Sequence, residues 1–566
     1  MNSPAFSRRS GLFLVIAVAL ALRLVDLPLR YVTRSVDERP YVYSGLALWE
    51  GITPTYKYSP AGPQIWISWV YAAADSARYL IHPSAEERAA PFVLRPFIAG
   101  NHALFDIYRD LSQLRYIEVI ASLLVGVAAS GAAFLLGWKR GGLAPAILVG
   151  GMTAILPIFL DMSDQARPYM MGWGFAIISL YYAAIAADRP SAARCSAIFM
   201  GLAIASRIDM LMILPLAWAD LRDLETSLFP RLRRIVQYSL LAMIVSLLVS
   251  PWILTNLIGN LRTIATVRIA EPVNGPASKW QTLFEIFAHQ GIGVDLAMVA
   301  CAIFLVAPDK NRVRWIAGGY VALLALSMIK ATGFGLQHQG GPLVALIAFA
   351  GVGLAAVQKR WPRLVAPALL LALIVPGAQA AADIVKHHRS ETDGYAADWI
   401  ERHVPSRTLV YSTPSLHKIL PTVADSDALW AAVNDNNAWT IKLKAGMTRF
   451  HITSTDYPRA FSEENMIIEK GLVRPWFILG SRPSIPDPRF DVHLFSESEV
   501  FRPADVVEDF KRTGGVIVCD DQEGIMPTDL GTPVVQWLSA NGRGVRIYCS
   551  PDMLDKFIDR QHLGDW

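Results

Sequence analysis

The sequence predicts a polytopic α-helical membrane protein with about 11 transmembrane helices and a C-terminal extracytoplasmic α/β domain. Of its 566 residues, 53% are hydrophobic and only 18% are charged, whereas a soluble protein carries about 25% charged residues. Long apolar runs fill residues 11–382, and from residue 383 onward the composition is that of a globular domain. The net charge of +4 is small. Basic residues gather in short connections between apolar runs, which indicates topology and no nucleic-acid partner.

The apolar runs define nine of the crossings, because a membrane helix needs about 20 apolar residues to span the hydrocarbon. Arg8 and Arg9 precede the first run, and no small-residue cleavage site follows it. We therefore expect an uncleaved first helix in place of a signal peptide. The runs are 11–29, 116–136, 142–159, 170–187, 235–254, 291–307, 315–330, 341–357 and 364–382.

The segment 194–219 is apolar at both ends, but Arg207 and Asp209 interrupt its middle. Basic loops stay in the cytoplasm. If the N-terminus is inside and 194–219 crosses once, the basic connection 222–234 and every later basic loop fall outside. If the segment instead consists of two short helices joined by a turn, all of these basic loops lie in the cytoplasm. The positive-inside rule therefore predicts a broken segment here.

The two short helices are predicted at 194–206 and 208–219. Neither crosses a bilayer alone, so both must be sheltered by other helices or lie below a polar cavity. The count then reaches eleven helices in a transmembrane domain of residues 1–382. It also places residues 383–566 outside, as a soluble extracytoplasmic α/β domain of a protein in the inner (cytoplasmic) membrane.

The first outer loop, 30–115, is too long to be a structureless connection and is expected to have a function. Two stretches in it, 40–50 and 63–80, have the pattern of amphipathic helices rich in Trp and Tyr. Such side chains suit the membrane interface. We therefore predict two helices lying at the outer membrane surface.

The C-terminal domain alternates short apolar strands with helical patterns, which is typical of an α/β fold. No phosphate loop, zinc spacing or nucleophile elbow occurs in it, so a supporting or acceptor-docking role is expected. Cys519 and Cys549 make a disulfide candidate if the domain is extracytoplasmic. The expected strands are 409–412, 450–453, 476–479, 516–519 and 545–549, and the expected helices are 396–403, 534–541 and 552–560.

Charged residues in the predicted outer loops are the candidates for chemistry. Asp37 and Glu38 follow the first helix at the water-facing lip, where a carboxylate can act as a general base on a hydroxyl group. The alternative is an ordinary solvated turn. Arg207 and Asp209 are flanked by apolar helix, and such charges usually face a cavity and serve function. The alternative for that pair is a structural ion pair.

Five short motifs fall in the predicted outer loops. The first loop holds an acidic pair, a Tyr-Lys motif and aromatic residues, and the second holds two acidic residues and an Arg-Pro-Tyr end. The motifs are Asp37-Glu38-Arg39-Pro40-Tyr41 with Leu48-Trp49-Glu50-Gly51, Tyr56-Lys57-Tyr58-Ser59-Pro60 and Trp66; Asp161 to Tyr169; Ala205 to Asp209; Ser250-Pro251-Trp252 with Asn256; and Gln337-His338-Gln339 with Pro342.

In order and spacing these motifs resemble the GT-C membrane glycosyltransferases, above all the lipid A aminoarabinose transferases and the protein O-mannosyltransferases. The resemblance covers residues 11 to about 360. It implies a sugar donor linked to polyprenyl phosphate, a single inverting displacement, and a lipid, glycan or protein acceptor in the cell envelope. Tyr56 stands directly before Lys57, where the aminoarabinose transferases tend to have an acidic residue, so a divalent metal ion is left open as a cofactor.

The resemblance also implies roles for individual residues. Asp37 is the expected base, and Asp164 orients the acceptor or the base. Basic groups in the outer loops stabilise the leaving phosphate, although binding of lipid headgroups is an alternative for each. The candidates are Asp37, Glu38 and Asp164 for catalysis, Lys57, Arg167, Arg207, Arg268 and Lys330 for the phosphate, and Tyr41, Tyr169, Asp209 and His338 elsewhere in the site.

The rival interpretation is a membrane transporter or lipid flippase in which the broken segment 194–219 forms the binding site. No internal repeat of the kind seen in many transporters is apparent, and the long first loop is unusual for one. A non-catalytic anchor for a binding domain is a third possibility, against which the charged outer loops argue.

Overall fold

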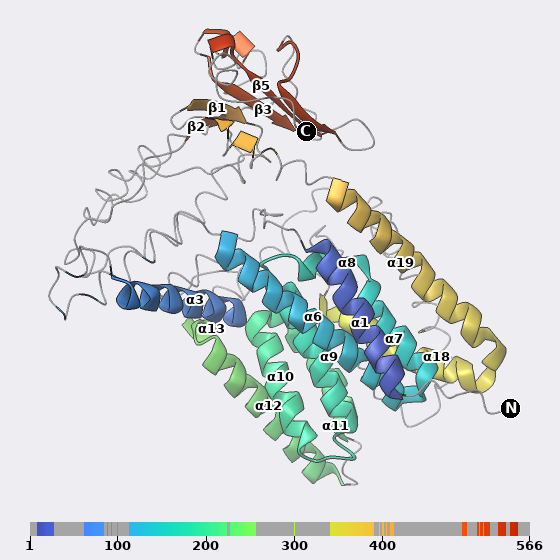
Figure 1. The fold of residues 1–566 in the computed structure, drawn as a ribbon. Helices are drawn as coiled ribbons and strands as arrows, with labels where there is room; N and C mark the ends of the chain where they lie inside the picture. The colour runs from blue at the N-terminus through green and yellow to red at the C-terminus, as the bar shows by residue number, and fades with distance from the viewer. Residues whose placement is uncertain are drawn as a thin grey trace, which may run out of the picture. The chain divides into compact units, whose positions relative to one another are not determined.

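The computed structural model describes residues 8–27, 61–83, 112–222, 227–255 and 340–389, together with shorter stretches elsewhere, chiefly between 396 and 552 (Figure 1). Contacts divide the chain into two units, which are described separately. The first unit comprises Met1–Leu27, Thr55–Trp66 and Ile117–Ile384, and the second comprises Pro28–Pro54, Ile67–Tyr116 and Val385–Trp566. The predicted domain boundary after residue 382 stays a prediction.

The described part of the first unit is helical throughout. The predicted apolar runs within it are mainly helical, but the run predicted as a single helix at 142–159 is broken at Leu156 into α7 and α8. The runs 291–307 and 315–330 lie outside the described residues. The helices are α1 Arg8–Asp26, α6 Ser112–Gly141, α7 Leu143–Ile155, α8 Pro157–Ser163, α9 Tyr169–Ile185, α10 Ala192–Ser206, η3 Ile208–Ile213, α11 Leu214–Arg222, α12 Leu228–Val249, α13 Trp252–Thr255, α18 Gly340–Arg360, η5 Pro362–Leu364 and α19 Val365–Arg389.

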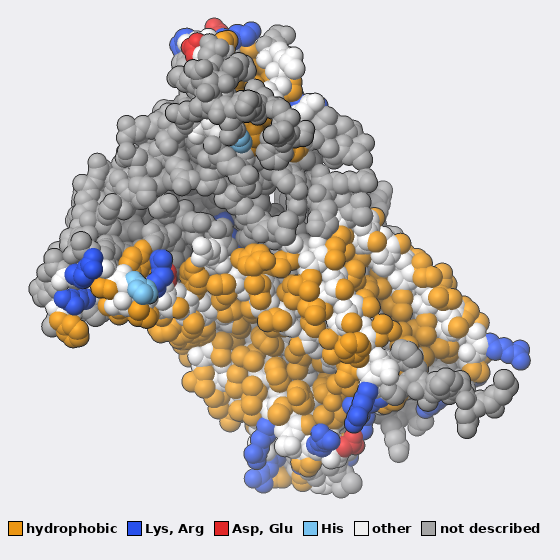
Figure 2. Space-filling view, in the orientation of Figure 1, with side chains coloured by type: hydrophobic (Ala, Val, Ile, Leu, Met, Phe, Trp, Pro, Cys, Tyr) orange, Lys and Arg blue, Asp and Glu red, His pale blue; other side chains and the backbone are white. Residues whose placement is uncertain are grey.

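Four of the described helices, α6, α12, α18 and α19, contain stretches long and apolar enough to cross a membrane. The pair α7 and α8, bent by 49°, makes a fifth span if it is counted as one. Figure 2 shows a broad hydrophobic surface over this unit, with Lys and Arg side chains gathered near one end. The chain is therefore a multi-pass membrane protein, and the count of eleven helices stays a prediction.

The predicted break in segment 194–219 is confirmed. Helix α10 ends at Ser206, Arg207 is extended with φ −148° and ψ 122°, and a 3₁₀ helix begins at Ile208. The side chains of Arg207 and Asp209 bond to each other across this turn. Residues two apart on an α-helix do not face each other. Arg207 and Asp209 could therefore not form this ion pair if the helix continued through them.

Hydrogen bonds between side chains hold the helices together inside the apolar core. The hydroxyl oxygens of Ser179 on α9, Ser196 on α10 and Tyr238 on α12 lie within 3.0–3.2 Å of one another. All three residues are buried. Such bonds fix the relative positions of membrane helices, because the hydrophobic effect contributes little to helix association within a lipid bilayer.

Ion pairs lie at the basic ends of these helices. Lys139 at the end of α6 pairs with Asp188 at 2.6 Å. Its neighbour Arg140 binds both carboxylate oxygens of the buried Asp220. These contacts lie where α6, α9 and α11 end, whereas Arg207 lies at the other end of α10. The break thus faces away from the basic connections.

Helix α3, Gly62–Ile81, confirms the predicted amphipathic helix at 63–80. The companion stretch 40–50 lies outside the described residues. Trp66 is 38% exposed, and its indole N–H donates to the carbonyl oxygen of Val249 at 2.8 Å. The start of α3 is therefore fastened to the end of α12.

In the second unit, the C-terminal part forms a five-stranded sheet of order β2-β1-β3-β5-β4. β1 is parallel to β2 and β3, whereas β5 is antiparallel to β3 and β4. The predicted strands 409–412, 516–519 and 545–549 are confirmed, and 450–453 and 476–479 lie outside the described residues. The strands are β1 Thr408–Ser412, β2 Phe490–Leu494, β3 Val516–Asp520, β4 Val535–Leu538 and β5 Gly544–Cys549.

The helix predicted at 534–541 is wrong, because Val535–Leu538 is strand β4. Val535 and Trp537 pack on the core while Gln536 between them is exposed. That alternation has the period of two that a half-buried strand shows. Strand β2 was not predicted. The described residues within 396–403 are helical, as predicted, and most of 552–560 lies outside the described residues.

The predicted Cys519–Cys549 disulfide is contradicted, because both cysteines are free and buried. In the β3–β5 pairing, Cys549 lies opposite Val516 and Cys519 lies opposite Arg546. Three residues of strand span about 10 Å, beyond the Cα separation of about 7 Å that a disulfide bridges. Since side chains alternate between faces, the two thiols also point to opposite sides of the sheet.

Burial raises the pKa of Cys549 to about 12, which keeps its thiol protonated.

Candidate functional site

The broken helix places a buried ion pair at the end of α10. The guanidinium of Arg207 donates from Nε to Oδ1 of Asp209 at 2.9 Å and from Nη2 to Oδ2 at 3.2 Å. The two side chains are 9% and 12% exposed. The sequence left open whether Arg207 pairs with Asp209, and the structure shows that it does. This two-bond geometry uses one edge of the guanidinium and fixes its plane.

Tyr169, at the start of α9, lies beside two arginines. The guanidinium carbon of Arg207 lies 4.1 Å from the centre of the Tyr169 ring, and that of Arg167 lies 5.8 Å from it. Both distances fall within the range of a cation–π contact. The ring also packs against Trp173 at 6.0 Å, and Trp173 packs against Phe159 at 5.4 Å. The two guanidinium groups therefore contact one end of a row of three buried aromatic rings.

The acidic segment after α8 lies next to this cluster along the chain. Asp164 follows the last residue of α8 and is only 3% exposed. Gln165 donates from Nε2 to Oδ1 of Asp161 at 2.9 Å, and the Gln165 carbonyl oxygen accepts from the Arg167 backbone N–H at 2.8 Å. This tight turn places the carboxylate of Asp164 and the guanidinium of Arg167 in one buried segment.

The start of α3 reaches the same place from the segment that the sequence assigns to the first outer loop. The backbone N–H of Ala61 donates to the carbonyl oxygen of Ser206 at 3.2 Å. Gln64, which is fully buried, donates from Nε2 to the Arg167 carbonyl oxygen at 3.2 Å. The loop therefore binds both the turn beside Arg207 and the segment that carries Arg167.

The approach of this loop is close enough to require glycine. A Cβ at Gly62 would lie 2.1 Å from the hydroxyl oxygen of Ser250 and 2.9 Å from the Val249 carbonyl oxygen. Ser250 itself donates to the carbonyl oxygen of Ala205 at 3.0 Å. The ends of α10 and α12 and the start of α3 thus meet at one point. The residue before the glycine, Ala61, is held at φ +47°, which a non-glycine residue rarely adopts.

Five predicted site residues are described, and four of them form one cluster: Arg167, Tyr169, Arg207 and Asp209. The fifth, Asp164, is buried three residues before Arg167. Sequence reasoning missed Gln64, although a glutamine inside an apolar helix start was a usable signal. The remaining predicted residues lie outside the described residues: Asp37, Glu38, Tyr41, Lys57, Arg268, Lys330 and His338.

Chain length limits how far Lys57 can be from the described cluster. It precedes Ala61 by four residues, and four residues span at most about 14 Å. Ala61 is bonded to the carbonyl of Ser206, the residue before Arg207. Lys57 itself lies outside the described residues, and its role stays a prediction.

No group of three or more His, Cys, Asp or Glu side chains gathers as a metal site within the described residues. Metal dependence stays a prediction. What the described residues do supply is two guanidinium groups beside the ring of Tyr169, one of which is also bonded to the carboxylate of Asp209. A site of this kind suits a phosphate, which planar guanidinium groups bind through paired hydrogen bonds.

No family model matches the chain, and no curated protein matches it. Among solved structures, it is similar to ArnT from Cupriavidus metallidurans bound to undecaprenyl phosphate, with 13% identity, 96% of this chain and 98% of that chain covered, and a TM-score of 0.47. The apo state of ArnT gives 14% identity, 97% and 99% coverage and a TM-score of 0.48.

The chain is also similar to the oligosaccharyltransferase AglB from Archaeoglobus fulgidus, in complex with an inhibitory peptide and a dolichol-phosphate. This likeness has 11% identity, 77% of this chain and 68% of that chain covered, and a TM-score of 0.42. These neighbours are of the GT-C class, which is the class that the sequence motifs resemble.

Proposed function

We propose that the chain is an inverting GT-C glycosyltransferase, which moves a sugar from a polyprenyl-phosphate donor to an envelope acceptor on the outer face of the membrane. The observation that carries this proposal is the position of Arg207. It lies at the end of α10 opposite the basic connections, and it is held by Asp209 and Tyr169 next to Arg167. A cation placed there meets the headgroup of a lipid-linked donor at the membrane surface.

The leaving group explains why the site is basic. When the sugar departs, the polyprenyl phosphate gains negative charge, and fixed cations stabilise that charge without reorganising. The bond pair with Asp209 uses two of the five N–H donors of a guanidinium. It therefore fixes the plane of the Arg207 guanidinium. In this proposal Arg167 and Lys57 contact the same phosphate, and Arg268 and Lys330 come from later loops.

The displacement needs one base and one stabilised leaving group. The acceptor hydroxyl or amine gives its proton to Asp37 as its oxygen or nitrogen attacks the anomeric carbon of the sugar. The bond from that carbon to the phosphate oxygen breaks, and its electron pair stays on the phosphate. In this proposal Asp164 orients the acceptor or the base, and Glu38, Tyr41 and His338 are further candidates for the site.

The proposed topology follows from the charges at the two ends of the helices. Basic residues occupy the connections near Lys139 and Arg189, and such connections face the cytoplasm of an inner membrane. The cluster around Arg207 then faces the periplasm. In this proposal residues 383–566 are also extracytoplasmic, and their α/β domain supports the transferase or docks the acceptor. A transporter shares the broken helix, but it has no need of a general base beside the phosphate.

A strain that lacks this chain is expected to accumulate the lipid-linked sugar and to lose one glycan modification of its envelope. Mass spectrometry of the envelope glycans and of the polyprenyl-phosphate lipids measures both changes. The wild-type gene should restore both, and Arg207→Ala should not. Arg363→Ala removes an exposed arginine at the basic end of the helices and is the matched control, which should restore both. An unchanged glycan and lipid profile in the deletion strain would contradict the proposal.

A further inference from the structure

Helix α1 carries a buried arginine in its last turn, and the proposed reaction gives this residue no role. Arg23 is only 2% exposed. Its Nε donates to the hydroxyl oxygen of Ser163 at 3.0 Å, and its two terminal nitrogens donate to the carbonyl oxygens of Ala154 and Thr153, both at 3.2 Å. One guanidinium thus binds the end of α7 and the end of α8 at once.

The carbonyls that Arg23 binds lie where the helix is broken. In an α-helix the carbonyl of residue 153 would accept from the N–H of residue 157, but Pro157 has no N–H. The chain leaves the helical conformation at Leu156, with φ −57° and ψ 127°, and α8 departs at 49° from α7. The guanidinium of Arg23 supplies the donor that the proline removes from Thr153.

A glycine on a fourth helix makes room for this contact. A Cβ at Gly126 on α6 would lie 2.7 Å from Nε of Arg23 and 2.9 Å from the hydroxyl oxygen of Ser163. Both distances are shorter than a Cβ contact allows, so any larger residue would separate the two partners. The ends of α1, α7 and α8 are therefore joined at one point against α6.

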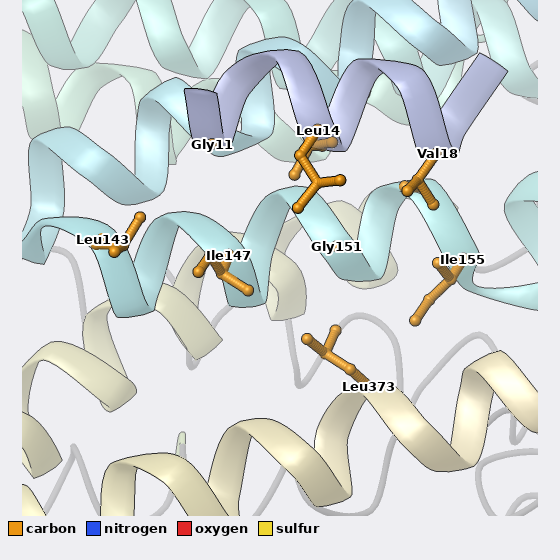
Figure 3. A pocket seen from close by; sticks show the side chains of 10 residues that line it. Gly11, Leu14, Val18, Leu143, Ile147, Gly151, Ile155 and Leu373 are labelled. Carbon is orange, nitrogen blue, oxygen red and sulfur yellow. The ribbon is translucent and has the colours of Figure 1, made fainter. Parts of the chain in front are cut away.

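Apolar side chains line the cavity that α1 and α7 share. Figure 3 shows Leu14 and Val18 of α1 beside Ile147 and Ile155 of α7, with Leu373 of α19 below them. These side chains line an entirely apolar cavity of about 420 Å³. Apolar burial is non-directional and does not by itself set the angle of α8. The hydrogen bonds of Arg23 to α7 and α8 are directional.

We infer that Arg23 is a positioning residue, which fixes α8 and so places the buried Asp164 relative to the end of α1. Ser163, which Arg23 binds, is the residue directly before Asp164. Arg23 therefore sets the position of the segment that carries Asp164, and this role in catalysis rests on the proposed function.

The test compares Arg23→Lys and Gly126→Ala with a matched control. The lysine keeps the charge but loses the planar fork, and the alanine at 126 displaces Arg23 while leaving it intact. Gly131→Ala on the same helix is the control, because a Cβ there meets Ile16 at an ordinary 3.4 Å. Hydrogen exchange of residues 157–167 is measured by mass spectrometry, with α10 as the internal reference.

Both test variants should raise exchange in 157–167 and leave α10 unchanged. They should also lower kcat by up to about 100-fold, the size expected for a misplaced catalytic group, with little change in the donor KM. Unchanged exchange in 157–167 would overturn the inference, as would faster exchange throughout the helices with a normal kcat. If the wild type transfers no sugar, the proposed function fails, and the exchange data still decide whether Arg23 holds α8.

Discussion

Replacing Asp37 by asparagine is expected to abolish sugar transfer while the protein still folds and binds its donor. Asparagine has nearly the shape of aspartate but cannot accept a proton, so the attacking group keeps its hydrogen. Loss of a general base costs a factor of about 100 to 10,000 in rate. Turnover is measured as polyprenyl phosphate released per folded protein, and donor binding is measured separately on the same preparation.

The adjacent carboxylate provides the control for this substitution. Glu38→Gln removes the same charge one residue further along the chain, so a purely electrostatic role for the pair would make the two variants equally slow. The proposed mechanism expects a much smaller loss for Glu38→Gln. Wild-type turnover in a well-folded Asp37→Asn protein would remove Asp37 as the base.

Substituting Arg207 should weaken donor binding strongly. A hydrogen bond to a charged group contributes about 1.5–3 kcal/mol, which corresponds to a loss of about 10-fold to 150-fold in affinity. We therefore expect Arg207→Ala to raise the donor Kd by about that factor. Arg207→Lys should recover only part of the affinity, because an ammonium cannot reproduce two parallel bonds. Equilibrium binding of the polyprenyl-phosphate sugar in detergent measures each value.

The same variants separate binding from stability, since Arg207 also pairs with Asp209. Arg207→Ala leaves that carboxylate partly buried without its cation, so Tm should fall, and adding Asp209→Ala should recover some of the loss. Arg140→Ala is the matched control, because it breaks a similar pair with Asp220 at the basic end of the helices. It should lower Tm and leave the donor Kd unchanged. A lowered Tm with unchanged donor affinity in Arg207→Ala would make Arg207 part of the scaffold.

Periodicity and charge predicted the membrane part of the fold because both are local or topological signals. The break at Arg207 followed from a single argument, the side of the membrane on which the basic loops must lie, and the ends of α10 and η3 agree with it. Four described site residues were then found together, since the turn and the start of α9 lie at the same helix end.

Long-range contacts explain what the sequence could not predict. Residues 534–541 contain apolar side chains that suit either a helix or a strand, and pairing of Val535 with Ile547 on β5 decides for a strand. The spacing of Cys519 and Cys549 contained no information on register or face. The contacts of Gln64 and Arg23 join segments about 100 or more residues apart in the chain. No local pattern indicates such partners.

The release of free polyprenyl phosphate tests the central claim most directly. Purified protein in liposomes is given a polyprenyl-phosphate sugar together with an envelope extract as the source of acceptor, and the lipid products are separated by mass. A glycosyltransferase releases polyprenyl phosphate in step with sugar gained by the acceptor, and Asp37→Asn protein releases none. Donor that stays intact with wild-type protein, or that only changes leaflet, would contradict the account and favour a transporter.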